Sequence, residues 1–175
     1  MSLSLKTEAL ILKKYSLPGS DRIVTLFTKE LGRVRAVAKG IKKITSRRLP
    51  HIETANLVSV TLSRSKETYY YRDSLLVSGF SNIKSNRENI SYVYYLFFIL
   101  EKILPEEQPE PLVYRTTINF LVDLSKRNTN EAFPLATYIN AVLKNLGYTK
   151  EELTLASMER LLEDMINEKL PSLSI

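Results

Sequence analysis

The spacing of hydrophobic residues changes once along this chain, near Asn82. Up to that point apolar side chains occur in short runs or alternate with polar ones, as in strands, whose side chains point alternately to opposite faces. Beyond it they recur every three or four residues, as on one face of a helix. The sequence therefore predicts an α+β protein, with a β domain over residues 1–82 and a helical domain over residues 83–175.

Five strands are expected in the β domain, joined by turns and by one longer basic loop. The second and third strands form a hairpin through the turn Lys29–Gly32, where glycine is the residue that most easily adopts a positive φ. We place the strands at residues 7–14, 22–28, 32–40, 56–64 and 68–80. Five short strands close most economically as an OB-fold β-barrel.

Four helices are expected in the all-α domain that follows. Ser85 and Glu88 have the spacing of a capping box, which predicts the start of the first helix. The stretch Pro105–Pro111 cannot be helical throughout because of its prolines, so we interpret it, with Glu106 and Glu107, as a solvated linker. The other helices are predicted at 112–126, at 130–146 with Asn130 as N-cap and Gly147 as C-cap, and at 154–169.

Charge is distributed unevenly between the two parts. Residues 1–84 contain 16 Lys and Arg against 6 Asp and Glu, a net charge of +10, whereas residues 85–175 contain 9 against 13, a net charge of −4. A positive surplus confined to one domain is typical of a protein that contacts a polyanion with that domain alone. The first domain is therefore the candidate for nucleic-acid binding.

The stretch from Gly32 to Lys43 concentrates this charge on one strand and the loop after it. Val34, Ala36 and Ala38 share the inner face of the strand, which leaves its basic residues on the outer face. Such a surface can follow a phosphate backbone, although a solvated edge strand protected from aggregation by charge has the same pattern. The candidate DNA contacts are Arg33, Arg35, Lys39, Lys42, Lys43, Arg47 and Arg48.

Tyr69, Tyr70 and Tyr71 follow one another in the last expected strand. Alternation places Tyr69 and Tyr71 on one face and Tyr70 on the other, so at least one of them packs in the core. Stacking on unpaired bases is the alternative role for this run, because aromatic rings often line the cationic grooves that hold single strands.

Several function classes are excluded by residues that the chain lacks. There is no cysteine, and His51 is the single histidine, so thiolate or histidine-rich metal sites are not expected. We predict no metal, no cofactor and no catalytic step. Since no apolar run reaches the roughly 20 residues of a membrane span, we also predict no membrane contact and a cytoplasmic location.

Two motifs of the first domain are specific, Asp21–Thr28 (DRIVTLFT) and Gly32–Gly40 (GRVRAVAKG), and weaker ones follow at Phe133–Ala136 (FPLA) and Leu146–Tyr148 (LGY). On these residues the chain resembles RecO, a family of bacterial recombination mediators. The resemblance implies an N-terminal OB domain and a C-terminal helical domain. It also implies binding of single- and double-stranded DNA, annealing of strands coated with single-strand binding protein, and help to RecR in loading RecA.

The chain departs from the RecO pattern in two places. Many RecO-like proteins insert a four-cysteine zinc module after the position of Tyr148, whereas this chain continues directly into its last expected helix, as a short form. In some members, basic residues just before the counterpart of Phe133 hold the acidic tail of single-strand binding protein, but Glu131 and Ala132 stand there. The cations expected to contact such a tail are therefore Lys126, Arg127 and Lys144.

These features favour a nucleoid-associated mediator of recombinational repair that captures the DNA backbone on its barrel. Its expected partners are DNA, RecR and single-strand binding protein. The alternative is a non-catalytic interaction scaffold that binds RecR or single-strand binding protein and contacts DNA only weakly. A measured DNA affinity separates the two.

Overall fold

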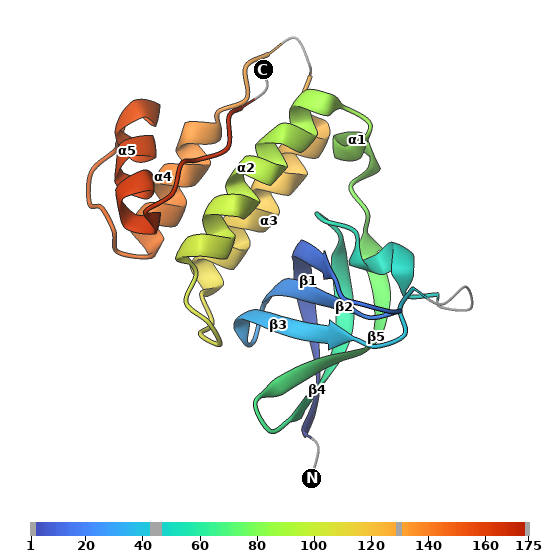
Figure 1. Ribbon diagram of the computed structural model, residues 1–175. Helices are drawn as coiled ribbons and strands as arrows, with labels where there is room; N and C mark the ends of the chain where they lie inside the picture. Colours follow the sequence, from blue (N-terminus) through green and yellow to red (C-terminus); the bar gives the residue numbers. More distant parts are fainter. Residues whose placement is uncertain (1–2, 43–46, 129–130, 174–175) are drawn as a thin grey trace. The chain divides into compact units, whose positions relative to one another are not determined.

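The computed structural model describes residues 3–42, 47–128 and 131–173. The chain divides into two compact units, one built of strands and one built of helices (Figure 1). The barrel unit comprises Met1–Gly79 together with Leu104–Pro109, and the helical unit comprises Phe80–Ile103 together with Glu110–Ile175. The segment Leu104–Pro109, which contains most of the predicted linker Pro105–Pro111, therefore belongs to the barrel unit.

The strands of the barrel unit form a closed barrel in the order β1-β2-β3-β5-β4. Neighbouring strands are antiparallel except β3 and β5, which run parallel and pair only at Ala36 with Tyr69 and Val37 with Tyr70. The strands are β1 (Leu3–Ser16), β2 (Arg22–Thr28), β3 (Gly32–Ala38), β4 (Leu57–Ser65) and β5 (Thr68–Ser78). This architecture confirms the predicted OB-fold barrel.

Strand β1 is longer than the sequence predicted, because it pairs with β4 through its first half and with β2 through its second. A register shift between Ile11 and Lys13 lies in the part that pairs with β2. The core inside the barrel contains the residues that alternation placed there, including Val34 and Ala36 from β3 and Tyr71 from β5. A short 3₁₀ helix, η1 (Leu49–Ile52), adds Ile52 to this core.

Among its described residues, the helical unit contains one helix that the sequence did not reveal and four that it did. The unexpected helix is the single turn α1, and the capping box was predicted one residue too early. Ser85 is the C-cap of α1, and the side chain of Asn86 caps α2 by accepting a 2.9 Å hydrogen bond from the Asn89 N–H. The helices are α1 (Ser81–Lys84), α2 (Arg87–Ile103), α3 (Pro111–Lys126), α4 (Leu135–Asn145) and α5 (Leu155–Ile166).

Helix α4 begins only at Leu135, after Pro134, and Asn130 lies outside the described residues. Helix α4 ends one residue earlier than predicted, at Asn145, with Leu146 as the C-cap and Gly147 after it. Gly147 has a φ of +79°, its N–H donates to the Lys144 carbonyl (3.0 Å), and the next N–H, that of Tyr148, donates to the Leu143 carbonyl (2.9 Å). These two hydrogen bonds together form the Schellman motif, in which glycine is favoured.

The helices of this unit pack around an apolar core. Helix α3 packs against α4, and α5 contacts both α2 and α4. Residues that contribute to this core include Leu96, Leu121, Ile139, Leu143, Met158 and Leu162, all at most 1% exposed. Over the part of the chain that the structure describes, no helix combines the length and apolar character that a membrane span requires.

Candidate nucleic-acid interface

The segment Leu104–Pro109, hereafter the acidic strap, lies on the barrel beside β3 and is held there by Arg33. The guanidinium of Arg33 donates from Nε to the Leu104 carbonyl (2.9 Å) and from Nη1 to Oε1 of Glu106 (3.1 Å). The Arg33 carbonyl in turn accepts from the N–H of Glu107 (2.9 Å). With 8% of its surface exposed, Arg33 is the anchor of the strap rather than an open surface cation.

The two carboxylates of the acidic strap also face other cations of the barrel. Oε1 of Glu106 lies 3.7 Å from Nη2 of Arg35, and Oε2 of Glu107 lies 2.8 Å from Nη1 of Arg64. Burial raises the pKa of Tyr69, and the nearby Glu107 carboxylate adds to the rise. Glu106 and Glu107 are exposed to solvent, as predicted, but they also form ion pairs that compensate part of the barrel's positive charge.

Two more of the predicted cations are held by backbone carbonyls. Nζ of Lys42 donates to the carbonyls of Leu17 and Gly19 in the turn after β1. Arg48 binds three carbonyls: Nη1 those of Tyr71 (3.1 Å) and Arg72 (2.9 Å), and Nη2 that of Lys39 (2.9 Å). Strands β3 and β5 pair at two positions. The hydrogen bonds of Arg48 add a further link between the end of β3 and β5.

Three of the remaining predicted DNA contacts are exposed on the barrel. Arg35 has a side chain that is 58% exposed despite its distant contact with Glu106. Lys39 and Arg47 are exposed as well, and Lys43 lies outside the described residues. The structure thus divides one run of basic residues into cations that hold the barrel and its strap together and cations that face solvent.

An aromatic side chain lies among the solvent-facing cations. Tyr70 points out of the barrel, with Nζ of Lys39 4.9 Å and Cζ of Arg72 5.1 Å from the centre of its ring. Nε of Arg72 donates to Oγ of Ser63 (2.6 Å), which fixes the guanidinium over the ring. We call this surface, formed by Val37, Lys39, Ser63, Tyr70 and Arg72, the Tyr70 patch.

Sequence reasoning missed Arg72 because it looked for basic residues on and after β3 alone. Alternation was a sufficient signal, since Arg72 is two residues from Tyr70 and shares its face of β5. It also predicted correctly that Tyr69 and Tyr71 share one face, and this face is the inner one, where they are 7% and 1% exposed. Tyr70 and Arg72 therefore both belong to the Tyr70 patch.

The division into units preserves the charge asymmetry. The barrel unit contains 15 Lys and Arg against 8 Asp and Glu, a net charge of +7, and the helical unit contains 10 against 11, a net charge of −1. The asymmetry is smaller than residues 1–84 suggested, because two strap glutamates count with the barrel and Lys84 counts with the helical unit. The surplus of positive charge still lies on the unit that contains the Tyr70 patch.

Residues 1–80 match the family described as "Recombination protein O N terminal", and residues 84–151 match "Recombination protein O C terminal". The chain belongs to the RecO family. The first RecO match covers the strands of the barrel, and the second covers the helices from α2 to α4. The predicted family is thereby confirmed.

Curated relatives, each called DNA repair protein RecO, agree with this assignment. The protein of Caldanaerobacter subterraneus is 28% identical over 144 residues, 82% of this chain and 58% of the relative. The protein of Dehalococcoides mccartyi is 28% identical over 162 residues, which are 93% of this chain and 64% of the relative. The protein of Geobacter metallireducens is 32% identical over 148 residues, which are 83% of this chain and 59% of the relative. The chain thus spans about three fifths of the length of these RecO proteins.

The helical unit of this RecO chain presents the three predicted partner-binding cations in different settings. Lys126 is exposed, and Lys144 forms an ion pair with Glu152. The side chain of Arg127 is only 6% exposed and binds the carboxylate of Glu88. Hydrogen bonds from Arg127 and then from Tyr92 lower the pKa of Glu88 below its ordinary value. Of the three, Lys126 is the one that faces solvent without an ion pair among the described residues.

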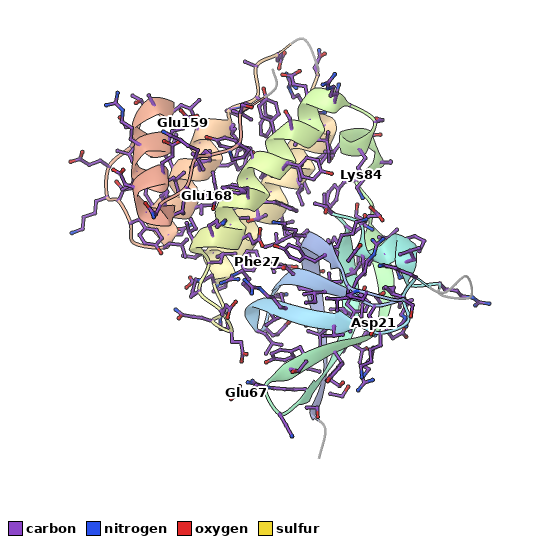
Figure 2. All side chains as sticks on the ribbon, in the orientation of Figure 1. Asp21, Phe27, Glu67, Lys84, Glu159 and Glu168 are labelled. Carbon is purple, nitrogen blue, oxygen red and sulfur yellow. The ribbon has the colours of Figure 1, made fainter. Side chains whose placement is uncertain are left out.

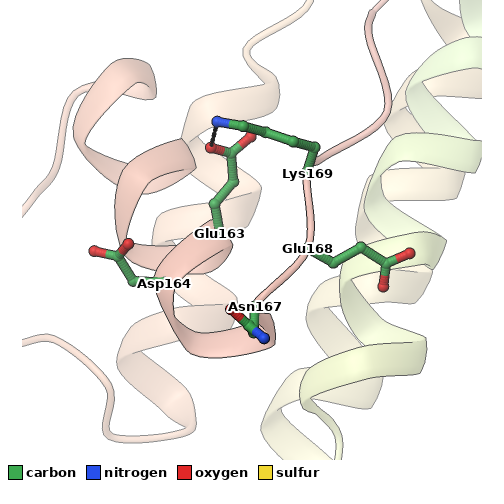
Figure 3. Close-up of a pocket in the computed structure, with 5 residues that line it drawn as sticks. All are labelled: Glu163, Asp164, Asn167, Glu168 and Lys169. Carbon is green, nitrogen blue, oxygen red and sulfur yellow. Dashed lines mark hydrogen bonds and ion pairs between the residues drawn. The ribbon is translucent and has the colours of Figure 1, made fainter.

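A shallow pocket lies at the C-terminal end of α5 (Figure 3). Its lining residues are Glu163, Asp164, Asn167, Glu168 and Lys169. Lys169 is bound to Glu163 through Nζ and Oε2 (2.6 Å), and Glu168 pairs with Lys102 of α2. No group of three or more acidic or histidine side chains among the described residues has the arrangement of a metal site. This pocket therefore does not add to the nucleic-acid interface.

Proposed function

We propose that this RecO chain binds DNA through the outer face of its barrel unit. The observation that carries the proposal is the cluster of solvent-facing cations on and near β3 and β5, formed by Arg35, Lys39, Arg47 and Arg72. A backbone phosphate needs a cation that can approach it, and these four side chains are exposed to solvent on or near β3 and β5. Arg33, Lys42 and Arg48 act in this proposal by positioning the barrel surface.

Membership of the RecO family gives this binding a context in recombinational repair. We propose that the chain, as its resemblance implies, anneals DNA strands and supports RecR in loading RecA, without a catalytic step. Single-strand binding protein is proposed as a further partner through the helical unit, with Lys126 as the accessible cation. DNA binding by the barrel is the first of these steps that can be measured on the chain alone.

Neutralising Arg35, Lys39 and Arg72 together by glutamine should weaken DNA binding and flatten its dependence on salt. Each phosphate contact that is lost removes about 0.7 to 0.9 from the slope of log affinity against log salt, so the triple variant should lose about 2. The measurement is a titration of single-stranded and duplex DNA by fluorescence anisotropy at several salt concentrations.

The matched control neutralises Arg115, Lys126 and Arg160, three exposed cations of the helical unit, and changes the net charge by the same amount. This control should keep the slope of the unchanged protein within experimental error. Equal losses in both triples would show that DNA binding is not localised on the barrel. Weak binding that neither triple alters would instead favour the interaction scaffold.

A further inference from the structure

Tyr70 points outward from β5, at a position where this strand lies between β3 and β4. It pairs with Val37 of β3 on one side and with Ser63 of β4 on the other. Its neighbours Tyr69 and Tyr71 are in the core, so the outward direction of Tyr70 follows from the strand itself. Val37 is partly exposed beside it, which gives the patch an apolar floor of two side chains.

The cations of the Tyr70 patch differ from the other barrel cations in what they contact. Arg33, Arg35 and Arg64 face carboxylates of the acidic strap. Lys39 and Arg72 form no ion pair with a carboxylate within the described ranges and approach the ring of Tyr70 instead. Two barrel cations with no carboxylate partner among the described residues therefore lie beside one aromatic ring.

A flat ring between cations fits one ligand class better than others. A phosphate alone requires cations and makes no use of a tyrosine ring or of Val37. A nucleotide offers both parts, an anionic phosphate and a base with a flat apolar face that stacks on aromatic rings or on guanidinium planes. In a duplex the faces of the bases are covered by their neighbours, so only an unpaired base can use such a surface.

We infer that the Tyr70 patch is a stacking site for an unpaired nucleobase, with Lys39 and Arg72 holding the adjacent phosphates. The inference rests on the proposed DNA binding and deepens it, because it gives the barrel a preference for single strands. The hydrogen bond from Arg72 to Ser63 keeps the guanidinium in place over the ring, so that base and guanidinium can stack without reordering the side chain.

The test compares three DNA probes of equal length: oligothymidylate, an abasic strand with the same number of phosphates, and a duplex. Tyr70→Leu should weaken binding of the full chain to oligothymidylate by about tenfold. It should leave the affinities for the abasic strand and the duplex unchanged. Tyr70→Phe should keep the affinity for oligothymidylate, because it keeps the ring. Tyr94→Leu, which removes a tyrosine that is 55% exposed on α2, is the matched control and should have no effect.

A second measurement does not require the leucine variant to fold. The chain contains no tryptophan, so Tyr70→Trp introduces a single reporter at the site. Oligothymidylate should quench its fluorescence, and the abasic strand should not, whereas Tyr94→Trp should respond to neither.

Equal quenching by both strands, or an equal loss of affinity for both in Tyr70→Leu, would overturn the stacking site while leaving DNA binding intact. If the unchanged protein binds none of the three probes, the proposed function itself fails, and the two failures are thereby distinguished.

Discussion

Gly32→Ala is expected to lower the free energy of unfolding of the barrel unit by about 3 kcal/mol, the sum of a left-handed backbone penalty and an overpacking penalty. Gly32 has a φ of +71°, a conformation that costs little only for glycine. A Cβ at this position would lie 1.8 Å from the carbonyl oxygen of Gln108 in the acidic strap. That neighbour is backbone and has no rotamer with which to move away, so the strap must shift.

Gly19→Ala is the matched control, because it shares the backbone penalty and lacks the clash. Gly19 has a φ of +76°, and nothing lies within 4 Å of the position its Cβ would take. We expect this variant to lose only about 1 kcal/mol. Urea unfolding followed by circular dichroism measures both, with an unchanged m-value as the sign that only stability has changed. Similar losses in the two variants would mean that the strap does not lie against Gly32.

The barrel could be predicted from the sequence because each strand is indicated by a local pattern of residues. Strict alternation in Val58, Val60 and Leu62 and the hairpin turn ending at Gly32 each determine one strand and its inner face. The pairing order then follows from the few ways in which five such strands can close. The core residues of β3 and β5 were correct for the same reason, since alternation fixes the face once the strand is known.

The sequence could not predict which basic side chains are exposed and which are bound within the barrel unit, because this depends on contacts between distant positions in the chain. Arg33 and Arg35 have the same charge and the same outward direction in β3. They differ because the acidic strap, some seventy residues later in the chain, covers Arg33 and leaves most of Arg35 exposed. No local pattern indicates which arginine a later glutamate binds.

The N-cap of α2 and the surroundings of Arg127 were also predicted wrongly from local sequence. Ser85 and Asn86 are adjacent and both good cap residues, so sequence alone placed the helix start within one residue but did not select the cap. Arg127 was predicted as a surface cation for a partner because it follows the last turn of α3. Its ion pair with Glu88 and its bond to Asn89 come from α2, almost forty residues earlier.

Arg127→Met is expected to destabilise the helical unit by about 2 kcal/mol, because the buried side chain of Arg127 loses its hydrogen bonds although its partner Glu88 is partly exposed. The guanidinium uses all three of its nitrogens. Nη2 binds Oε1 of Glu88, Nη1 binds Oδ1 of Asn89, and Nε binds the Glu131 carbonyl, each at 2.9 Å. Cζ lies 5.5 Å from the centre of the Tyr92 ring. Methionine keeps much of the aliphatic volume but leaves the buried Asn89 side chain without this donor.

Lys144→Met is the matched control, because Lys144 also forms an ion pair within the helical unit but a more exposed one. An exposed pair contributes little, so this variant should lose less than about 1 kcal/mol. Thermal unfolding gives the two stabilities, and an NMR titration of the Glu88 carboxyl gives an independent readout. Because Arg127 is the main cause of the lowered pKa of Glu88, that pKa should rise in Arg127→Met and stay low in Lys144→Met. If Arg127→Met keeps both its stability and the low pKa of Glu88, the guanidinium is not bound at the start of α2. It would then be as available to a partner as Lys126.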